Sequence, residues 1–365
     1  ISCFIAEAGH HGTIDVIGIG HQASRGVKSG TIIDLRAAET AVSHAVEAAE
    51  IMAKNQLMGQ PIRSVFVNIP GTHALPHLLQ AETKIHSHDV GERELRQIKN
   101  QARHVTVAEK DELVHIIAGP YSVDQQKGIQ DPRGMTGHTL AAQLNIVTGL
   151  TTATRNLRHV TAHNHLDIDG FFVSPYAAGL SALVDDEMDL GCTVIDMGGG
   201  TTSIAVFAEG RLIYTAAIPV GGQHVTNDIA RGLTTSVVDA ERIKNLYGSA
   251  HAVIGDDSAV IDVPPIGEED HAQPNYVPKS LLTGIIQPRI EETFELVRAR
   301  LVDSGISPRT GRRVVLTGGA SQLPGVSDIA HMILDKQVRL GRPQKIKGLA
   351  DATCGPVARG RRRGR

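Results

Sequence analysis

The chain has 365 residues, of which 41% are hydrophobic, enough to fill the cores of two domains. Its formal net charge of −3 argues against a general nucleic-acid binder, which would carry an excess of positive charge. No apolar run approaches the roughly 18 residues that span a bilayer, and no signal-peptide pattern is present, so we expect a cytoplasmic protein.

The first part of the chain, residues 1–69, has an α/β pattern. Two strand patterns, residues 1–8 and 13–21, precede a long helix over residues 34–56, with Asp34 placed to cap its first turn. Apolar residues recur on one face of this helix, namely Leu35, Ala38, Val42, Ala45, Val46, Ala49 and Met52. A strand that we expect to be buried, residues 62–69, stops at Pro70.

Residues 70–147 have a different pattern. Strands are predicted at 75–85 and 112–117, around one helix over 91–103. An inserted α/β subdomain explains this change, although the pattern itself does not say which kind. The chain then returns to the first domain over residues 148–191.

The most informative stretch follows a predicted strand over residues 192–197. Asp196 lies near the end of that strand, and the next residues are Gly198, Gly199, Gly200, Thr201 and Thr202. Three glycines let backbone N–H groups approach a phosphate without a Cβ in the way, and Asp196 is placed to hold a hydrated Mg²⁺. Strands follow at 204–207 and 211–218, whereas a P-loop would continue into a helix and carry a lysine. An ordinary glycine-rich hairpin is the alternative.

Three further motifs follow. Gly221 and Gly222 open a helix whose N-terminal amides can face an anion. Glu241 and Lys244 are three residues apart on the next helix, where they would bind a ribose and an adenine edge, or form a surface salt pair. After a short strand, Gly318, Gly319, Ala320 and Ser321 precede an apolar helix, so that a purine could lie flat on the backbone; a plain turn is the alternative.

A long amphipathic helix is predicted over residues 279–302. Pro288 lies inside it and should kink or split it, because proline removes a hydrogen-bond donor and clashes one turn back. Just past this position, Arg289 and Glu292 stand one turn apart. They form either a solvated salt-bridged face or part of a binding surface.

In this order, the four glycine and charge motifs resemble the nucleotide site of the actin-like ATPase superfamily: the second phosphate loop, a nearby helix, the Glu/Lys ribose contact and the adenosine loop. Five stretches make the match closer: residues 65–69, 131–135, 173–179, 194–202 and 314–326. From about residue 5 to 348 the chain resembles the FtsA family of bacterial cell-division proteins. The resemblance implies a two-domain actin-like (ribonuclease H-like) ATPase fold that binds ATP and Mg²⁺.

The same resemblance implies a division into parts. Residues 1–69 and 148–191 would form the first domain, and 70–147 the inserted 1C (SHS2-like) subdomain, which helps filament contacts and recruits later division proteins. The second domain would comprise a core at 192–238, a small nucleotide-flanking subdomain at 239–310, and a core with the adenosine loop at 311–350. A basic tail, 351–365, would follow.

The implied function is that of a cytoskeletal adaptor. ATP would close the two domains, the closed form would polymerise, and the polymer would link FtsZ to the cytoplasmic face of the inner membrane and to later division proteins at the septum. Turnover would be slow or absent. Arg289 and Glu292 would lie on the surface that receives the acidic C-terminal tail of FtsZ. The alternatives are MreB-like or pilus-assembly actin homologues, or a sugar-kinase or chaperone-like ATPase; for a kinase we find no convincing catalytic aspartate.

Two departures from the family pattern concern the ends. The family's first phosphate loop, a strand ending in Asp-x-Gly-Thr-Ser-Lys, would precede Ile1, and we expect that the sequence is incomplete there. In the tail, five of the last seven residues are arginine. Such a segment cannot form the apolar face of a membrane-targeting helix, so we expect a truncated or frame-shifted tail.

Histidine and cysteine offer few other sites. His86 and His88, and likewise His163 and His165, have spacings that a metal could use, but both pairs lie in polar stretches and we favour solvated surface. Cys3, Cys192 and Cys354 are far apart and form no CxxC pair, so we expect reduced thiols.

Overall fold

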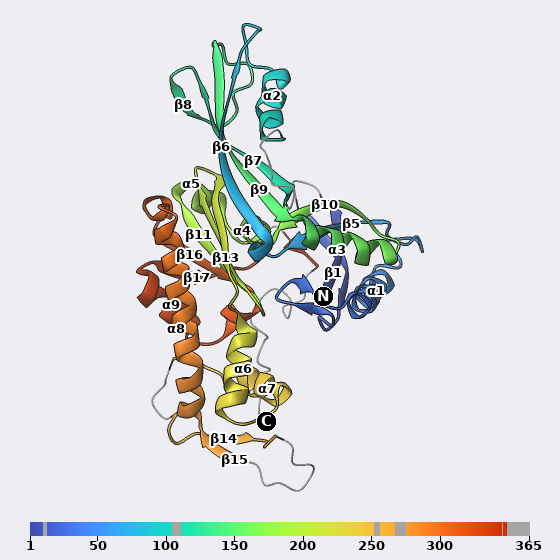
Figure 1. Cartoon of the computed structure of the whole chain (residues 1–365), viewed down its shortest axis with the longest axis vertical. Helices are drawn as coiled ribbons and strands as arrows, with labels where there is room; N and C mark the ends of the chain where they lie inside the picture. Colours follow the sequence, from blue (N-terminus) through green and yellow to red (C-terminus); the bar gives the residue numbers. More distant parts are fainter. Residues whose placement is uncertain (10–12, 104–110, 252–255, 267–274, 345, 349–365) are drawn as a thin grey trace.

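The computed structural model describes residues 1–9, 13–103, 111–251, 256–266, 275–344 and 346–348. The basic tail predicted over 351–365 therefore lies outside the described residues. The molecule is elongated: an inserted sheet projects at one end, the first domain lies to one side of the middle, and the second domain occupies the middle and the other end (Figure 1). None of the described helices combines the length and apolarity needed to cross a bilayer.

In the first domain, helix α1 (Leu35–Met52) packs on a hairpin of β1 (Ser2–Ala8) and β2 (Ile14–His21). The predicted cap is present, because Asp34 accepts a hydrogen bond from the Ala37 amide at 3.1 Å. The predicted apolar face is partly wrong: the buried residues are four alanines, Ala38, Ala41, Ala45 and Ala49, whereas Leu35 and Met52 are exposed.

The reason lies in strand β2. A Cβ at Gly20 would lie 1.7 Å from the Ala45 carbonyl oxygen, and one at Gly18 would lie 2.4 Å from that of Ala49. The helix backbone therefore touches the strand backbone, and only alanine fits on the helix face between them.

Two further strands of the first domain form a separate sheet in the described residues. β5 (Ser64–Ile69) pairs in parallel with β10 (Asp167–Val173), and α3 (Thr151–His163) packs beside them. β5 was expected to be buried, but its residues alternate and Phe66 is 70% exposed, because β10 is its one described partner strand. A short hairpin, β3 (Val27–Lys28) and β4 (Thr31–Ile32), and the two-residue strand β18 (Ile346–Lys347), which pairs with β2, complete this part.

The insert is a four-stranded antiparallel sheet in the order β6-β9-β7-β8, covered on one face by α2. Its elements are η2 (Gly71–His73), β6 (Ala74–Lys84), α2 (Glu92–Arg103), β7 (Asp111–Val123), β8 (Gln126–Ile129) and β9 (Thr139–Leu150). The sequence pattern indicated β6, α2 and part of β7 but not β9, the strand that pairs with β6 along its whole length. Residues 144–149 of β9 are all buried, so this half of the strand lacks the alternation that marks a half-exposed strand.

The second domain is built on a five-stranded sheet in the order β13-β12-β11-β16-β17. Its strands are β11 (Cys192–Met197), β12 (Thr202–Ala208), β13 (Arg211–Ile218), β16 (Arg313–Thr317) and β17 (Gln337–Leu340). One face packs on α6 (Gly222–Gly232), α7 (Val237–Tyr247), α8 (Lys279–Asp303) and α9 (Val326–Leu334), and the other on α4 (Ser174–Ala182) and α5 (Asp185–Leu190). The short elements are β14 (Val260–Val263), β15 (Asn275–Pro278), η3 (Ser307–Arg309) and η4 (Gly319–Gln322).

Helix α8 runs without interruption through Pro288. We expected proline to kink or split the helix; the split is wrong, and the kink stays a prediction. Its buried residues on both sides of the proline, among them Leu282, Ile286, Ile290 and Phe294, pack into the core of the second domain. This packing outweighs the loss of one backbone hydrogen bond.

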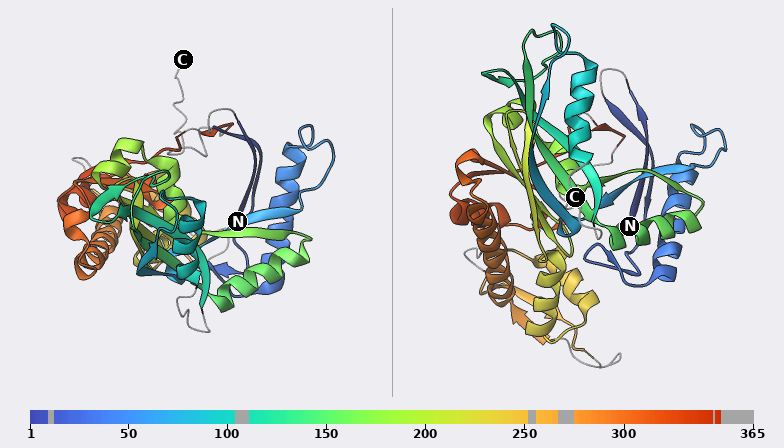
Figure 2. Two further views of the ribbon diagram at one scale, coloured as in Figure 1. Left: turned by 90° about the horizontal axis from the view of Figure 1, so that it is seen from above. Right: turned by 45° about the horizontal axis from the view of Figure 1, so that its top comes forward.

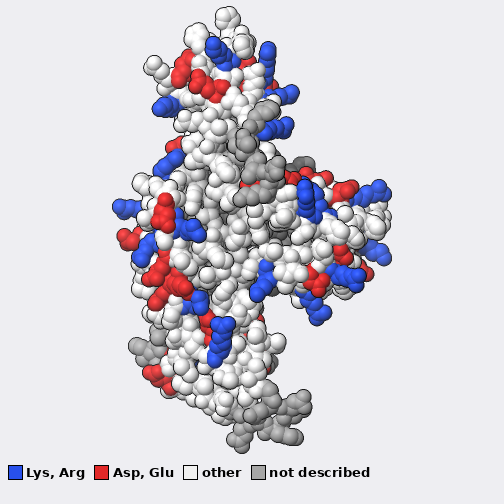
Figure 3. All heavy atoms as spheres, viewed as in Figure 1, with Lys and Arg blue, Asp and Glu red and all other residues white. Residues whose placement is uncertain are grey.

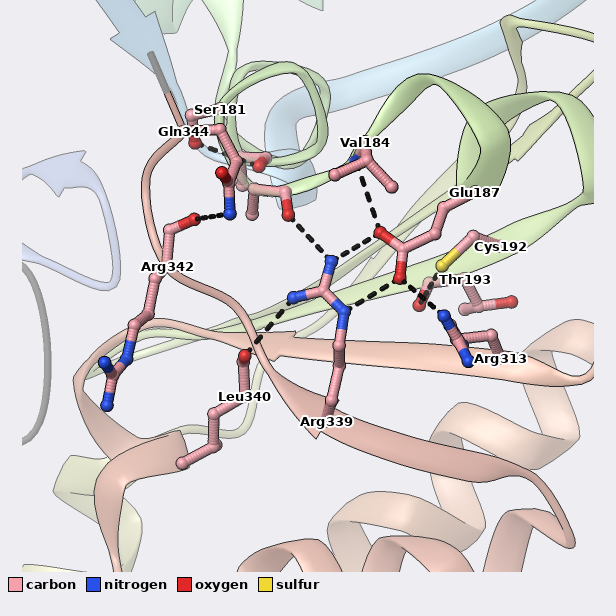
Figure 4. Close-up of polar contacts among 12 residues, drawn as sticks. Ser181, Val184, Glu187, Cys192, Thr193, Arg313, Arg339, Leu340, Arg342 and Gln344 are labelled. Carbon is pink, nitrogen blue, oxygen red and sulfur yellow. Dashed lines mark hydrogen bonds and ion pairs between the residues drawn. The ribbon is translucent and has the colours of Figure 1, made fainter. Parts of the chain in front are cut away.

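A buried carboxylate ties α5 to the second sheet (Figure 4). Glu187, 6% exposed, accepts hydrogen bonds from Arg339 Nε at 2.8 Å and Arg313 Nη1 at 3.2 Å, and a further one from Arg339 Nη2. Arg339 also donates to the Ala182 carbonyl oxygen at 2.9 Å. The two guanidinium groups therefore join β16 and β17 to the end of α4 and to α5.

Candidate nucleotide-binding site

The predicted phosphate loop is a tight turn between β11 and β12, and backbone amides of α6 donate hydrogen bonds to its carbonyl oxygens. Gly198 N–H donates to the Thr201 carbonyl oxygen at 2.9 Å and closes the turn. Gly222 N–H donates to the Gly198 carbonyl at 2.9 Å, and Gln223 N–H to the Gly199 carbonyl at 2.7 Å. The first amides of α6 were expected to face an anion, but in the structure they hold the loop.

Two other residues of this region also support the loop. Gly221 is required by a close approach, since a Cβ there would lie 2.6 Å from the Gly198 carbonyl oxygen. Thr202 is fully buried, and its hydroxyl donates to the Val220 carbonyl at 2.8 Å. The backbone of the loop is therefore fixed by contacts made away from its outer face.

The predicted adenosine loop lies beside the phosphate loop. β11 and β16 are parallel neighbours, with Asp196 paired to Thr317, so the loops that follow them emerge at the same edge of the sheet. Gly318 has φ +83°, and a Cβ there would lie 2.4 Å from the Met197 carbonyl oxygen. Ser321 is buried and donates its hydroxyl to the Gly318 carbonyl at 2.7 Å, which shapes the turn.

Glu241 and Lys244 form a partly buried cluster with Thr226. Lys244 Nζ lies 2.6 Å from Glu241 Oε2, 2.7 Å from the Thr226 hydroxyl and 3.3 Å from the Gly222 carbonyl oxygen. The Lys244 side chain is 14% exposed and that of Glu241 44%, so the lysine side of this pair is withdrawn from water while the carboxylate stays accessible. Burial alone would raise the pKa of Glu241, but hydrogen bonds from Lys244 and Thr226 outweigh it and lower that pKa. The cluster joins α7 to the start of α6.

Asp196 is partly exposed, and in the described part of the chain its side chain accepts one hydrogen bond, from Thr317. Burial raises its pKa, and the Thr317 hydroxyl, which donates to Oδ1 at 3.3 Å, acts in the opposite direction. A carboxylate next to a loop of backbone amides and hydroxyls is a donor set that suits a hydrated Mg²⁺. The residues present therefore fit this metal.

The outer faces of the two loops are open. A Cβ built at Gly199 or at Gly319 would meet no atom within 4 Å. At Gly200 a Cβ would instead lie 2.6 Å from the Ser29 hydroxyl, which belongs to the β3–β4 hairpin of the first domain. Ser29 was not singled out in the sequence, because nothing local links it to a loop 170 residues away.

Arg289 is engaged within the molecule. Its Nε donates to Asp228 Oδ2 at 2.5 Å and its Nη2 to Asp228 Oδ1 at 3.2 Å, while Nη1 donates to Glu292. The bidentate pair joins α8 to α6. The predicted pair of Arg289 and Glu292 is present, but Asp228, its closest partner on another helix, was missed.

A hollow of about 430 Å³ lies at the root of the insert, where β7 meets β13. Its lining includes Lys99, Tyr121, Tyr176, Phe207 and Arg211. On the face seen in Figure 3, basic and acidic side chains are mixed over the insert and the second domain, without a continuous field of one sign.

Comparison with known proteins identifies the family. Residues 193–356 match the family model for cell division protein FtsA, and residues 71–148 match the model for the SHS2 domain inserted in FtsA. Cell division protein FtsA of Agrobacterium fabrum is 46% identical over 344 residues, covering 94% of this chain and 76% of that protein. The protein of the same name from Pseudomonas aeruginosa is 33% identical, covering 98% of this chain and 84% of its own length.

Solved structures agree on the fold. A chain of the PilM-PilN type IV pilus biogenesis complex matches with a TM-score of 0.63 at 15% identity, covering 95% of this chain and 87% of its own. MreB5 of Spiroplasma citri, solved with ADP bound, matches with a TM-score of 0.52 at 16% identity, covering 91% and 76%. At these identities the two structures show the fold alone, and they confirm the predicted actin-like architecture. With its inserted SHS2 domain and its close relatives, the chain belongs to the FtsA family of cell division proteins.

Proposed function

We propose that this protein binds ATP with Mg²⁺ at the edge of the second sheet. The observation that carries the proposal is the convergence of four separate motifs. The loops at 198–202 and 318–321, the start of α6 and the Glu241/Lys244 pair contact one another, although they are spread over more than 120 residues. The open faces of Gly199 and Gly319 are where a ligand would lie.

The contacts suggest a role for each predicted residue. Backbone amides of Gly199 and Gly200 and the hydroxyl of Thr201 would face the phosphates, and Asp196 would hold water molecules of the Mg²⁺. The Gly198 amide would act indirectly, because it closes the turn by donating to the Thr201 carbonyl oxygen. Glu241 and Lys244 would contact the ribose and the adenine edge, and Gly318, Gly319 and Ala320 would support the purine. Thr202, Gly221, Gly222 and Ser321 would act indirectly, because their polar groups or close contacts hold the loops.

At the level of the cell, we infer that the protein polymerises and links the FtsZ tail to the inner membrane and to later division proteins at the septum. Membership of the FtsA family supports this inference. The insert, residues 70–147, would provide filament contacts and recruit later proteins, and the hollow at its root offers a place for a partner segment.

The FtsZ tail would dock on the subdomain at 239–310. Exposed apolar side chains next to or on α8, Tyr276 at 71% and Leu281 at 45%, offer contact area there. Acidic groups of the tail would have to compete with Asp228 and Glu292 for Arg289, since all of its donor nitrogens already have partners. Binding would thus exchange an internal ion pair for an intermolecular one.

The test is the Mg²⁺ dependence of ATP binding, measured by calorimetry. Asp196→Ala should abolish the Mg²⁺-dependent part of the affinity, because each charge-assisted hydrogen bond to a metal-bound water is worth about 1.5–3 kcal/mol. His86→Ala, on the insert, should bind as the parent does. Equal ATP affinity in Asp196→Ala and the parent, with and without Mg²⁺, would contradict the assignment.

A further inference from the structure

Three residues able to bind a metal meet on the outer face of the first domain, away from the nucleotide loops. Glu39 lies in the second turn of α1, and His159 and His163 stand one turn apart at the end of α3. The two helices pack side by side (Figure 2). Glu39 Oε1 lies 3.8 Å from His159 Nε2 and 3.8 Å from His163 Nδ1. One donor atom from each residue lies within 4.8 Å of the other two, and the described residues contain no other such group of three.

The two distances from Glu39 to the imidazoles are close to those between ligands of a bound Zn²⁺. With metal–ligand distances of about 2.0–2.1 Å, two donors of a tetrahedral site lie about 3.4 Å apart. The observed 3.8 Å is slightly wider. The two imidazoles are 51% and 54% exposed, so small rotations of their side chains can close this difference. The same exposure leaves an entry path and room for water as the remaining ligand.

The Glu39 carboxylate has few polar contacts with its other neighbours. Its side chain is 24% exposed, yet among the described residues no hydrogen bond is formed with its carboxylate. The two imidazole nitrogens lie 3.8 Å from its Oε1, a distance too long for a hydrogen bond. A half-buried carboxylate facing two imidazoles provides a net charge of −1 and three donor atoms for a divalent cation.

The surroundings hold the three residues in place. Asn164, at the end of α3, donates its side-chain amide to the Val160 carbonyl at 2.9 Å and to the Glu39 carbonyl at 3.3 Å. It thereby fixes the end of α3 against the α1 turn that carries Glu39. His163 Nδ1 also lies 2.9 Å from the His159 carbonyl oxygen, a contact that it gives up on binding a metal through this nitrogen.

We propose that Glu39, His159 and His163 bind one Zn²⁺ that braces α1 against α3. Two imidazoles and one carboxylate are donors that Zn²⁺ accepts, whereas Mg²⁺ and Ca²⁺ prefer oxygen ligands alone. The site uses His163 from the pair first noticed in the sequence, but its partners are His159 and Glu39 rather than His165. It does not depend on nucleotide binding.

The experiment measures Zn²⁺ affinity of the untagged, metal-free protein by competition with a chromophoric chelator. The parent should bind Zn²⁺ at this site, and Glu39→Gln, His159→Ala and His163→Ala should each weaken that binding at least tenfold. Co²⁺ is a second probe, because its visible absorption reports nitrogen and oxygen ligands in a low-coordinate site. That absorption should fall in the same three variants.

His165→Ala and His86→Ala are the matched controls, since both remove a histidine outside the cluster. They should bind Zn²⁺ and Co²⁺ as the parent does. Thermal unfolding without metal shows whether each variant is folded, and His159→Gln and His163→Gln serve where an alanine variant is not. Added Zn²⁺ should raise the unfolding temperature of the parent and of the controls but not of the cluster variants. Equal affinity in all variants, or an equal loss in the controls, would overturn the proposal.

Discussion

Three glycines of the candidate nucleotide site should respond differently to the addition of one methyl group. At Gly221 a Cβ would lie 2.6, 2.7 and 2.8 Å from Gly198 O, Gly199 O and Thr201 N, all of them backbone atoms of the phosphate loop. Gly221→Ala therefore forces the loop to move. Overpacking of this kind costs about 1–3 kcal/mol, and each kcal/mol lowers the unfolding temperature of a domain of this size by about 2–4 °C.

Gly199→Ala and Gly319→Ala place the methyl group in open space, because no atom lies within 4 Å of either Cβ position. Neither glycine has a positive φ, so alanine should leave the stability of the nucleotide-free protein unchanged or raise it by about 0.4–1 kcal/mol. If phosphates and purine lie on these faces, each methyl group collides with the ligand. ATP affinity should then fall at least tenfold, which corresponds to about 1.4 kcal/mol.

The assay pairs thermal unfolding without nucleotide with calorimetric ATP binding in the presence of Mg²⁺. The expected pattern is lower stability for Gly221→Ala, and undiminished stability with weakened binding for Gly199→Ala and Gly319→Ala. Full ATP affinity in both of the latter variants would show that the nucleotide lies elsewhere. An unchanged unfolding temperature for Gly221→Ala would refute the argument that α6 holds the loop from behind.

Two further predictions concern ion pairs. Hydrogen bonds from Arg339 hold the pKa of Glu187 below its usual 4.5, so its stabilising effect is complete above pH 4.5 and is lost as the pH falls through the lowered pKa. Glu187→Gln should therefore lower the free energy of unfolding by about 2 kcal/mol at pH 7 and reduce the loss of stability that the parent shows at acid pH. The same acid-induced loss of stability in the variant and the parent would contradict this prediction. Arg289→Gln should weaken binding of an FtsZ tail peptide more than tenfold, since a lost charge pair costs about 2–5 kcal/mol. Asp228→Asn, which removes one of the two carboxylates paired with the guanidinium, should not weaken it. Equal peptide affinity in the parent and both variants would place the docking surface elsewhere.

The parts of the fold that follow from local chemistry were predictable from the sequence. The Asp34 cap, the strand leading to Asp196 and the helix opened by Gly222 depend on neighbours in the chain, and the structure contains all three. The buried face of α1 was not predictable in the same way. It depends on Gly18 and Gly20, which bring a second element so close that only alanine fits between them.

The same division holds at the candidate site. Sequence motifs gave the glycine loops, but they did not indicate Thr226, Thr317 or Asp228. Each of these residues matters through one side-chain contact with another element, such as the bond from Thr317 to Asp196. The Glu241/Lys244 pair shows why. Its three-residue spacing is identical in a solvated surface pair and in a partly buried cluster, and only the packing of α6 against α7 distinguishes them.

The state of Asp196 connects stability with ligand binding. Because its pKa is raised in the folded chain, its contribution to stability is present at acid pH and is lost as the pH rises through the raised pKa. A hydrated Mg²⁺ beside Asp196 would favour its ionised form and so offset the effect of burial. The surrounding loops, in contrast, are already fixed by backbone hydrogen bonds from α6. Ligand binding would then need little rearrangement of the loops, and it would stabilise the folded chain to an extent set by the ratio of free ligand concentration to Kd.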